Sequence, residues 1–277
     1  MLMELLQDHG LLLAGVLLAG FASGYAGGLF GIGGGIVTVP ALYAVFQTLG
    51  IADGPSLKTA IGTSLGVIIV TSIRSLSTHH GAGQVDFSIL KSWAPWIAIG
   101  AVVGGLVAKW VPVELLTAVF AGGAFYIAWR RLFSKNKGHA TAKRKSLMHM
   151  KVPVGVGTGL FSALMGFGGG ALGVIFMTMA GRSMHQAIGT SAGFGVAVAV
   201  PGITGFILSG WGLEGLPPLS MGYVNLPAFV AMAVMAAISA PLGARLAHRV
   251  DGAILSKLFG GYVLLAAVSL IIDVFIA

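Results

Sequence analysis

The stretch Gly31-Ile32-Gly33-Gly34-Gly35 lies inside a long apolar run, and a near copy, Gly166-Phe167-Gly168-Gly169-Gly170, lies inside another. The offset in numbering between the two copies is 135 (166 − 31). Glycine loses more conformational entropy in a helix than any other residue, so such a cluster of glycines interrupts a helix. We therefore predict that both apolar runs are broken at these stretches.

Other motifs repeat in the same order, which predicts a chain of two homologous halves. Ala60-Ile61-Gly62-Thr63-Ser64 recurs unchanged as Ala187-Ile188-Gly189-Thr190-Ser191, at an offset of 127 (187 − 60). Gly83-Gln84-Val85-Asp86 recurs loosely as Gly222-Tyr223-Val224-Asn225, at an offset of 139 (222 − 83). The predicted parts are a first membrane repeat over residues 1–133, a basic linker over 134–151 and a second membrane repeat over 152–277.

The composition assigns the chain to a membrane. Of its 277 residues, 56% are hydrophobic and 9% are charged, whereas soluble domains carry about 25% charged residues. In each half we predict one glycine-broken segment followed by three full-length transmembrane helices, because a span needs about 20 apolar residues. The predicted segments are 11–49, 57–78, 89–109 and 113–133 in the first half, and 152–181, 186–209, 223–246 and 253–275 in the second. The fold class is all-α integral membrane: two repeats, each a glycine-broken helical hairpin plus three transmembrane helices, or about eight membrane segments in all.

The arms on either side of the second glycine cluster are short. They comprise about 14 and 11 residues, or about 21 and 17 Å at 1.5 Å per residue, so neither crosses a bilayer comfortably. A helical hairpin that turns at membrane depth is therefore expected. Lipid tolerates such a turn only where it is buried in protein or lines a wet cavity, so the glycines mark an internal site.

The Lys and Arg residues distinguish two possible topologies. Eight of the 16 lie between Arg130 and Lys151, and a basic loop between membrane segments indicates the cytoplasmic side. If each broken segment enters and leaves on one side, the halves are inverted, and 14 of these residues lie inside with only Lys58 and Lys109 outside. If each broken segment crosses once, 10 of the Lys and Arg residues lie inside and 6 lie outside. The rule that positive residues lie inside thus predicts inverted repeats, the layout of secondary transporters.

The residue types near the middle of the segments predict a site for a small anion. Asp, Glu, Lys and Arg are absent there, whereas glycine turns offer N–H groups at helix starts, which suit an oxyanion. The Thr-Ser pairs add hydroxyl donors, and we expect Thr→Val changes to remove binding without unfolding the protein. The candidate substrate-binding residues are Gly33, Gly34, Gly35, Thr63, Ser64, Gly168, Gly169, Gly170, Thr190 and Ser191. Lys58 and His185 occupy equivalent positions (185 − 58 = 127) and are candidates for attracting anions at the two mouths.

Each assignment has an alternative that the sequence leaves open. The glycines could serve tight helix packing, and the Thr and Ser hydroxyls could bond to a carbonyl one turn earlier. Lys58 and His185 could anchor helix ends. His79 and His80 have no further ligand at metal-binding spacing, so we expect them to lie in a loop and predict no metal site.

Several function classes are excluded. The chain has no cysteine, so it can form no disulfide or zinc-thiolate site. No Lys-Ser/Thr follows the glycine clusters, which rules out a phosphate-binding loop of nucleotide enzymes. Ser23 and Ser209 lack a histidine in any predicted span core and so lack the base of an intramembrane protease. We expect no catalytic residues, no cofactor and no nucleic-acid partner.

The order of the two glycine clusters, each followed by Ala-Ile-Gly-Thr-Ser, resembles the TauE/SafE family of sulfite and organosulfonate exporters. The resemblance covers nearly the whole chain, and it implies a permease of the bacterial inner membrane that carries an anion of the sulfonate class. It also implies that the glycine turns and Thr-Ser pairs hold the substrate.

The leading hypothesis is a secondary transporter that exports sulfite, sulfoacetate or a similar anion by alternating access. A passive anion channel and a permease for a different small anion are alternatives. A non-transporting membrane component is disfavoured, because the chain lacks a long soluble domain. The expected partners are the small anionic substrate, the lipid bilayer and a possible second copy in a homodimer.

Overall fold

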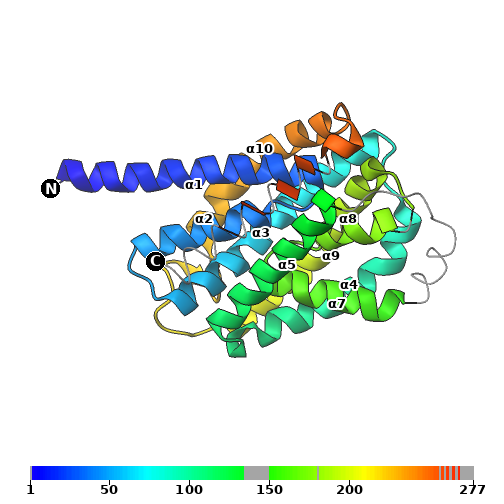
Figure 1. The fold of residues 1–277 in the computed structure, drawn as a ribbon. Coiled ribbons are helices and arrows are strands. Elements are labelled where there is room, and N and C mark those ends of the chain that lie inside the picture. Colours follow the sequence, from blue (N-terminus) through cyan, green and yellow to red (C-terminus); the bar gives the residue numbers. More distant parts are fainter. Residues whose placement is uncertain are drawn as a thin grey trace.

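The computed structural model is a bundle of long helices that lie roughly along one direction (Figure 1). It describes residues 2–133, 150–179 and 181–255, and beyond them residues 257, 258, 260, 261, 264, 265 and 268. The first half contains α1 (Leu2–Phe30), α2 (Gly35–Thr48), α3 (Asp53–Gly81), α4 (Phe87–Val107), the 3₁₀ turn η1 (Ala108–Trp110) and α5 (Val113–Phe133). The second contains α7 (Lys151–Met165), α8 (Gly170–Met179), α9 (Met184–Ser209), the antiparallel strands β1 (Ser220–Met221) and β2 (Val224–Asn225), and α10 (Leu226–Ala247).

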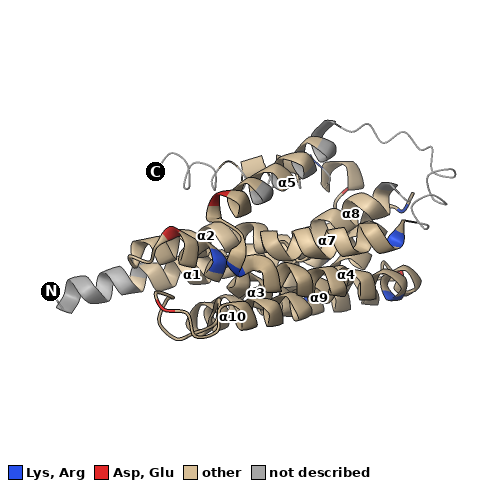
Figure 2. Ribbon diagram, turned by 90° about the horizontal axis from the view of Figure 1, so that it is seen from below, with Lys and Arg blue, Asp and Glu red and all other residues tan. Residues whose placement is uncertain are grey.

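The helices fit an all-α membrane protein. Within the described residues, five helices are long and apolar enough to cross a membrane: Leu12–Phe30, Asp53–Gly81, Phe87–Trp110, Met184–Ser209 and Leu226–Ala247. Figure 2 shows Lys, Arg, Asp and Glu gathered toward the two ends of the bundle, whereas the middle of the helices carries none of these colours. The linker over residues 134–149 and most of the predicted segment 253–275 lie outside the described residues. The number of about eight membrane segments therefore stays a prediction.

Both predicted interruptions are present, and they have the same backbone conformation. Gly31, Gly33 and Gly34 have φ angles of 67°, 76° and 81°, and the equivalent glycines at positions 166, 168 and 169 have 67°, 66° and 71°. Side chains other than glycine rarely adopt these positive angles, which explains the residue type. After each turn the chain starts a new helix, and α2 lies back alongside α1 (Figure 1).

Helices of one half pack mainly against helices of the other. Helix α1 packs along α10, and α7 packs in the equivalent way along α4. A Cβ placed on Gly24 of α1 would overlap the backbone of Ala236, and a Cβ placed on Gly159 of α7 would overlap the carbonyl oxygen of Ile97. Gly159 is the equivalent of Gly24 at the offset of 135 (159 − 24), and Ala236 is the equivalent of Ile97 at the offset of 139 (236 − 97). Glycine therefore allows the same close helix approach twice.

Helices α3 and α9 pack against each other in the middle of the bundle and run in opposite directions. The last turn of α3 lies at the start of α9, where a Cβ on Gly189 would be 3.2 Å from the Cβ of His79. We call this end of the bundle the basic end, because the starts of α4 and α7, the residues before α9 and the end of α10 meet here and carry Lys91, Lys151, Arg182, Arg245 and Arg249. The opposite end, which we call the far end, carries Lys58 and Lys109.

Candidate functional site

The two glycine turns meet crosswise at the centre of the bundle. A Cβ on Gly35 would overlap the carbonyl oxygen of Gly166, and a Cβ on Gly170 would overlap the carbonyl oxygen of Gly31. These two contacts are equivalent, because both pairs are related by the offset of 135 (170 − 35 and 166 − 31). The start of α2 therefore touches the glycine turn of the second half, and the start of α8 touches the glycine turn of the first half. The first N–H groups of an α-helix have no intrahelical acceptor, so the starts of α2 and α8 can offer donors beside the opposite glycine turn.

The side chain of Ile68, on α3, lies between the two turns. A Cβ placed on Gly33 or on Gly168 would lie 2.6 Å from the same methyl carbon, Cγ2 of Ile68. Ile68 is fully buried. Gly34 lies beside Ser23, and Gly169 lies beside Val198. Ile68 thus fills space between the two turns, and hydroxyls such as those of Ser23 and Ser72 border them as well. Sequence reasoning did not single out Ile68.

The serines of the two Thr-Ser pairs lie near the turns. Ser64 Oγ is 2.7 Å from the carbonyl oxygen of Ile61, one turn earlier, and 3.3 Å from that of Gly166. The alternative of bonding back to the helix therefore holds for Ser64. Ser191 Oγ is fully buried and has no hydrogen-bond partner among the described residues. One of the two serines thus keeps its hydrogen-bonding capacity free.

The threonines have a role that neither reading of the sequence anticipated. Thr63 Oγ1 accepts a hydrogen bond of 2.9 Å from the backbone N–H of Asn225, at the start of α10. Thr190 Oγ1 accepts one of 2.9 Å from the N–H of Asp86, at the start of α4. Each bond joins the two halves. Since α10 starts at the far end and α4 at the basic end, the structure does not bring Thr63 and Thr190 together.

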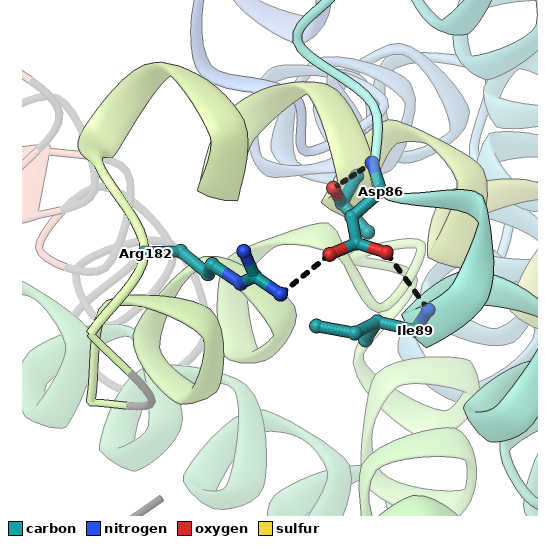
Figure 3. Close-up of polar contacts among 4 residues, drawn as sticks. Asp86, Ile89 and Arg182 are labelled. Atoms are coloured by element: carbon teal, nitrogen blue, oxygen red, sulfur yellow. Dashed lines mark hydrogen bonds and ion pairs between the residues drawn. The ribbon is translucent and has the colours of Figure 1, made fainter. Parts of the chain in front are cut away.

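The backbone N–H and both carboxylate oxygens of Asp86 form polar contacts at the basic end (Figure 3). Its side chain caps α4 by accepting from the N–H of Ile89 at 3.1 Å, and its other oxygen is 2.7 Å from Nη2 of Arg182. Both charged side chains are half-buried, at 30% exposure for Arg182 and 21% for Asp86. At the far end Asn225 caps α10 in the same way, through the N–H of Ala228 at 3.1 Å. The loosely repeated Gly-x-Val-Asp/Asn motif is therefore a helix start signal, which the preference of Asp and Asn for N-caps could have revealed.

Lys58 and His185 lie at opposite ends, as their sequence positions suggest. Lys58 Nζ donates to the carbonyl oxygen of Lys109 at 2.9 Å. His185 Nε2 is 3.2 Å from the carbonyl oxygen of Val250. Both contacts are those of side chains that anchor helix ends, and a role in attracting anions stays a prediction.

Known proteins are similar to this chain over most of its length. Residues 16–270 match the family described as Sulfite exporter TauE/SafE. The chain belongs to this family. A probable membrane transporter protein of Haemophilus influenzae is 32% identical to this TauE/SafE chain over 92% of the chain and 96% of the relative. Another, from Methanocaldococcus jannaschii, is 29% identical over 91% and 92% of the two chains. No solved structure matches.

Family membership confirms that the chain is a membrane transporter and not an enzyme. It is a multi-pass protein, as the candidate spans also indicate. The relatives are named as probable transporters without a substrate.

The expectation of a loop at His79 and His80 is wrong. Both residues belong to the last turn of α3, and His79 is fully buried. Its Nδ1 lies 2.8 Å from Nε2 of His248, and its Nε2 lies 3.2 Å from the carbonyl oxygen of Gly28. The i, i+4 spacing of Ser75 and His79 was the available signal, because it places both on one face of a helix. This TauE/SafE chain thus contains a buried imidazole that hydropathy alone does not reveal.

The Thr190→Val change should destabilise this TauE/SafE chain, in contrast to the sequence-based expectation that folding survives. It removes the acceptor for the N–H of Asp86. An unpaired buried donor costs about 1–3 kcal/mol, and because this hydrogen bond is partly buried we expect a loss near the lower end of that range. Thermal unfolding of purified protein in detergent measures the loss. Thr204 of α9 is exposed and bonds only to the carbonyl of Val200, so Thr204→Val is a matched control that should change stability by less than about 0.5 kcal/mol. Equal stability of the two variants would show that the hydrogen bond between the Asp86 N–H and Thr190 does not contribute to stability.

Proposed function

We propose that this protein exports a small sulfur oxyanion or organosulfonate, such as sulfite or sulfoacetate, by alternating access between two inverted repeats. The observation that carries the proposal is the crosswise contact of two glycine turns of equal conformation at the centre of the bundle. The opposite directions of α3 and α9, equivalent helices of the two halves, support the inversion. Inverted repeats allow one fold to open toward either side of the membrane by exchanging the conformations of its halves.

The anion site in this proposal lies between the two turns. The donors are the N–H groups at the starts of α2 and α8, with the hydroxyls of Ser64 and Ser191. Gly33, Gly34 and Gly35, and the equivalent Gly168, Gly169 and Gly170, allow the backbone to approach the anion closely. Thr63 and Thr190 act on the site by holding the starts of α10 and α4. An anion can enter only after the turns move apart and Ile68 withdraws.

Export needs no coupled ion on energetic grounds. With an inside-negative potential of about 100 mV, each negative charge that leaves a cell gains about 2.3 kcal/mol. This fits a site that has glycine turns and hydroxyls but no carboxylate to bind a proton or a cation.

Flux measurements on proteoliposomes test the proposal. Vesicles loaded with ³⁵S-sulfite should lose label when a potential makes their interior negative, and external unlabelled sulfite should accelerate exchange. Protein-free vesicles and vesicles with heat-treated protein are the controls. A passive anion channel would conduct without such counterflow. Equal transport of sulfate, thiosulfate and sulfoacetate would favour a permease of broader specificity, and no transport of any of them would refute the proposal.

We further propose that the linker is cytoplasmic in a bacterial inner membrane, with the basic end inside. The Ser146→Cys change lies in the linker, outside the described residues, and Leu213→Cys lies in the exposed loop between α9 and β1 at the far end. In intact cells an impermeant maleimide should label the cysteine at 213 and leave the one at 146 unlabelled until the membrane is opened. The reverse pattern would show that the orientation is opposite. Homodimer formation stays a prediction that the mass of the purified complex can test.

A further inference from the structure

One side of α3 carries a stripe of buried polar side chains. The stripe, called the α3 stripe below, consists of Thr71, Ser72, Ser75 and His79, each at most 1% exposed. The equivalent positions of α9, at the offset of 127 (198 − 71), are Val198, Ala199, Gly202 and Phe206. These are buried as well, but apolar. The two halves therefore differ at this place, although their turns and packing contacts match.

The α3 stripe connects the centre of the bundle with its basic end. Thr71 Oγ1 donates to the carbonyl oxygen of Gly33 at 2.7 Å. A Cβ on Gly33 would lie 3.2 Å from Ser72 Oγ, so this hydroxyl also borders the first glycine turn. At the other limit of the stripe, His79 contacts His248, the residue that follows α10. The stripe thus starts at the proposed anion site and ends at a pair of imidazoles at the basic end.

Two hydroxyls of the α3 stripe have no partner. Ser72 Oγ and Ser75 Oγ are buried, and neither forms a hydrogen bond within the described residues. A serine in a membrane helix usually bonds to a carbonyl one turn earlier, and a buried hydroxyl without a partner destabilises the conformation that contains it. That penalty disappears when water or an oxyanion reaches the hydroxyls. The stripe is therefore suited to a second, hydrated conformation.

The contacts near the two ends of the bundle differ in their chemistry. At the basic end the His79 and His248 rings meet edge to face, with centroids 4.8 Å apart. Burial, and secondarily the proximity of His185, lowers the pKa of His248, so its imidazole stays neutral and can share a hydrogen bond with His79. At the far end Phe206 meets Tyr223 with ring centroids 6.3 Å apart, and the Tyr223 N–H donates to the Phe206 carbonyl at 3.2 Å. Water can replace the side-chain hydrogen bond between the two imidazoles, whereas it offers no substitute for the contact between the two aromatic rings.

We propose that the α3 stripe lines the path of the anion between the glycine turns and the basic end, and that this path opens when His248 separates from His79. The proposal rests on the proposed transport function. Its occupant is a small hydrated oxyanion, to which the free hydroxyls of Ser72 and Ser75 donate. The equivalent face of α9 carries no hydroxyl, so a path lined by free hydroxyls belongs to the basic end alone.

Cysteine accessibility tests the path, because the chain has no cysteine of its own. The reagent is methanethiosulfonate ethylsulfonate, a small membrane-impermeant anion, applied to the basic end of the reconstituted protein. Ser75→Cys should react at about 0.1–10% of the rate of His80→Cys, which is exposed at the mouth, because minor open states are populated to about that extent. Ala199→Cys, the equivalent of Ser72 on α9, should remain unreacted over the same time. Ser72→Cys gives a second, deeper position, and gel filtration checks that each variant is folded.

A second substitution tests the gate. In the Ser75→Cys background, His248→Ala should raise the labelling rate at least about tenfold if it converts a minor open state into the major one. Phe206→Ala in the same background should leave that rate unchanged. Equal labelling of Ser75→Cys and Ala199→Cys, or labelling of Ser75→Cys only from the far end, would overturn the proposal. Failure of the wild-type protein to transport sulfite would refute the proposed function. The labelling experiment requires no substrate, so its result would still show whether the path exists.

Discussion

The Gly35→Ala variant should be unable to transport and should lose at least about 3 kcal/mol of stability, the upper part of the range for overpacking a well-packed interior. The added methyl group would overlap the carbonyl oxygen of Gly166, a backbone atom that cannot rotate away. The two glycine turns would have to separate permanently, and with them the starts of α2 and α8. Thermal unfolding in detergent and ³⁵S-sulfite flux measure the two effects.

A matched control lies in the same hairpin. A Cβ on Gly15 of α1 would have nothing within 4 Å, so Gly15→Ala should keep transport and gain up to about 1 kcal/mol from helix propensity. Wild-type stability and flux in Gly35→Ala would mean that the turns do not touch, and the anion site would have to be sought elsewhere.

The second large effect is expected for Gly159→Ala. Its Cβ would overlap the carbonyl oxygen of Ile97, which forces α7 away from α4 along their shared length. We expect a loss of about 3 kcal/mol or more, because the obstacle is again backbone. Purified protein should show a lower unfolding temperature, and its yield from membranes should fall.

Gly157, two positions earlier on α7, provides the comparison. It faces open space, with nothing within 4 Å of an added Cβ, so Gly157→Ala should be neutral or slightly stabilising. If both variants unfolded at the same temperature, close packing of α7 on α4 would not contribute to stability.

Local sequence signals predicted the helices and their interruptions. Glycine at positions 31, 33 and 34 is required by positive φ angles, and this requirement is visible as residue type. The predicted segment 186–209 agrees closely with α9, which starts at Met184 and ends at Ser209, because its apolar run is bounded by turn residues. The family followed from the same motifs.

The partners of the polar side chains could not be predicted. Thr63 and Asn225 lie in different halves of the chain, and no local spacing encodes such a pairing. The predicted segment 57–78 stopped just before His79, because hydropathy falls across Ser77 and Thr78. The helix continues to Gly81 because His79 is buried against α1 and α10. The contact of Ile68 with both turns depends on how the two halves dock, which composition does not reveal.

The packing of helices from one half against helices of the other has a consequence for biosynthesis. Helix α1 is synthesised first and ends at Phe30, but the helix that covers its glycine face, α10, starts only at Leu226. At about 5–20 residues per second, the ribosome needs about 10–40 s to make the intervening chain. During this interval lipid or the insertion machinery must occupy the surface of α1 around Gly24 and Gly28. Membrane insertion and final folding of the nascent chain are therefore separate events in time, and neither half can complete its helix contacts before the other has emerged.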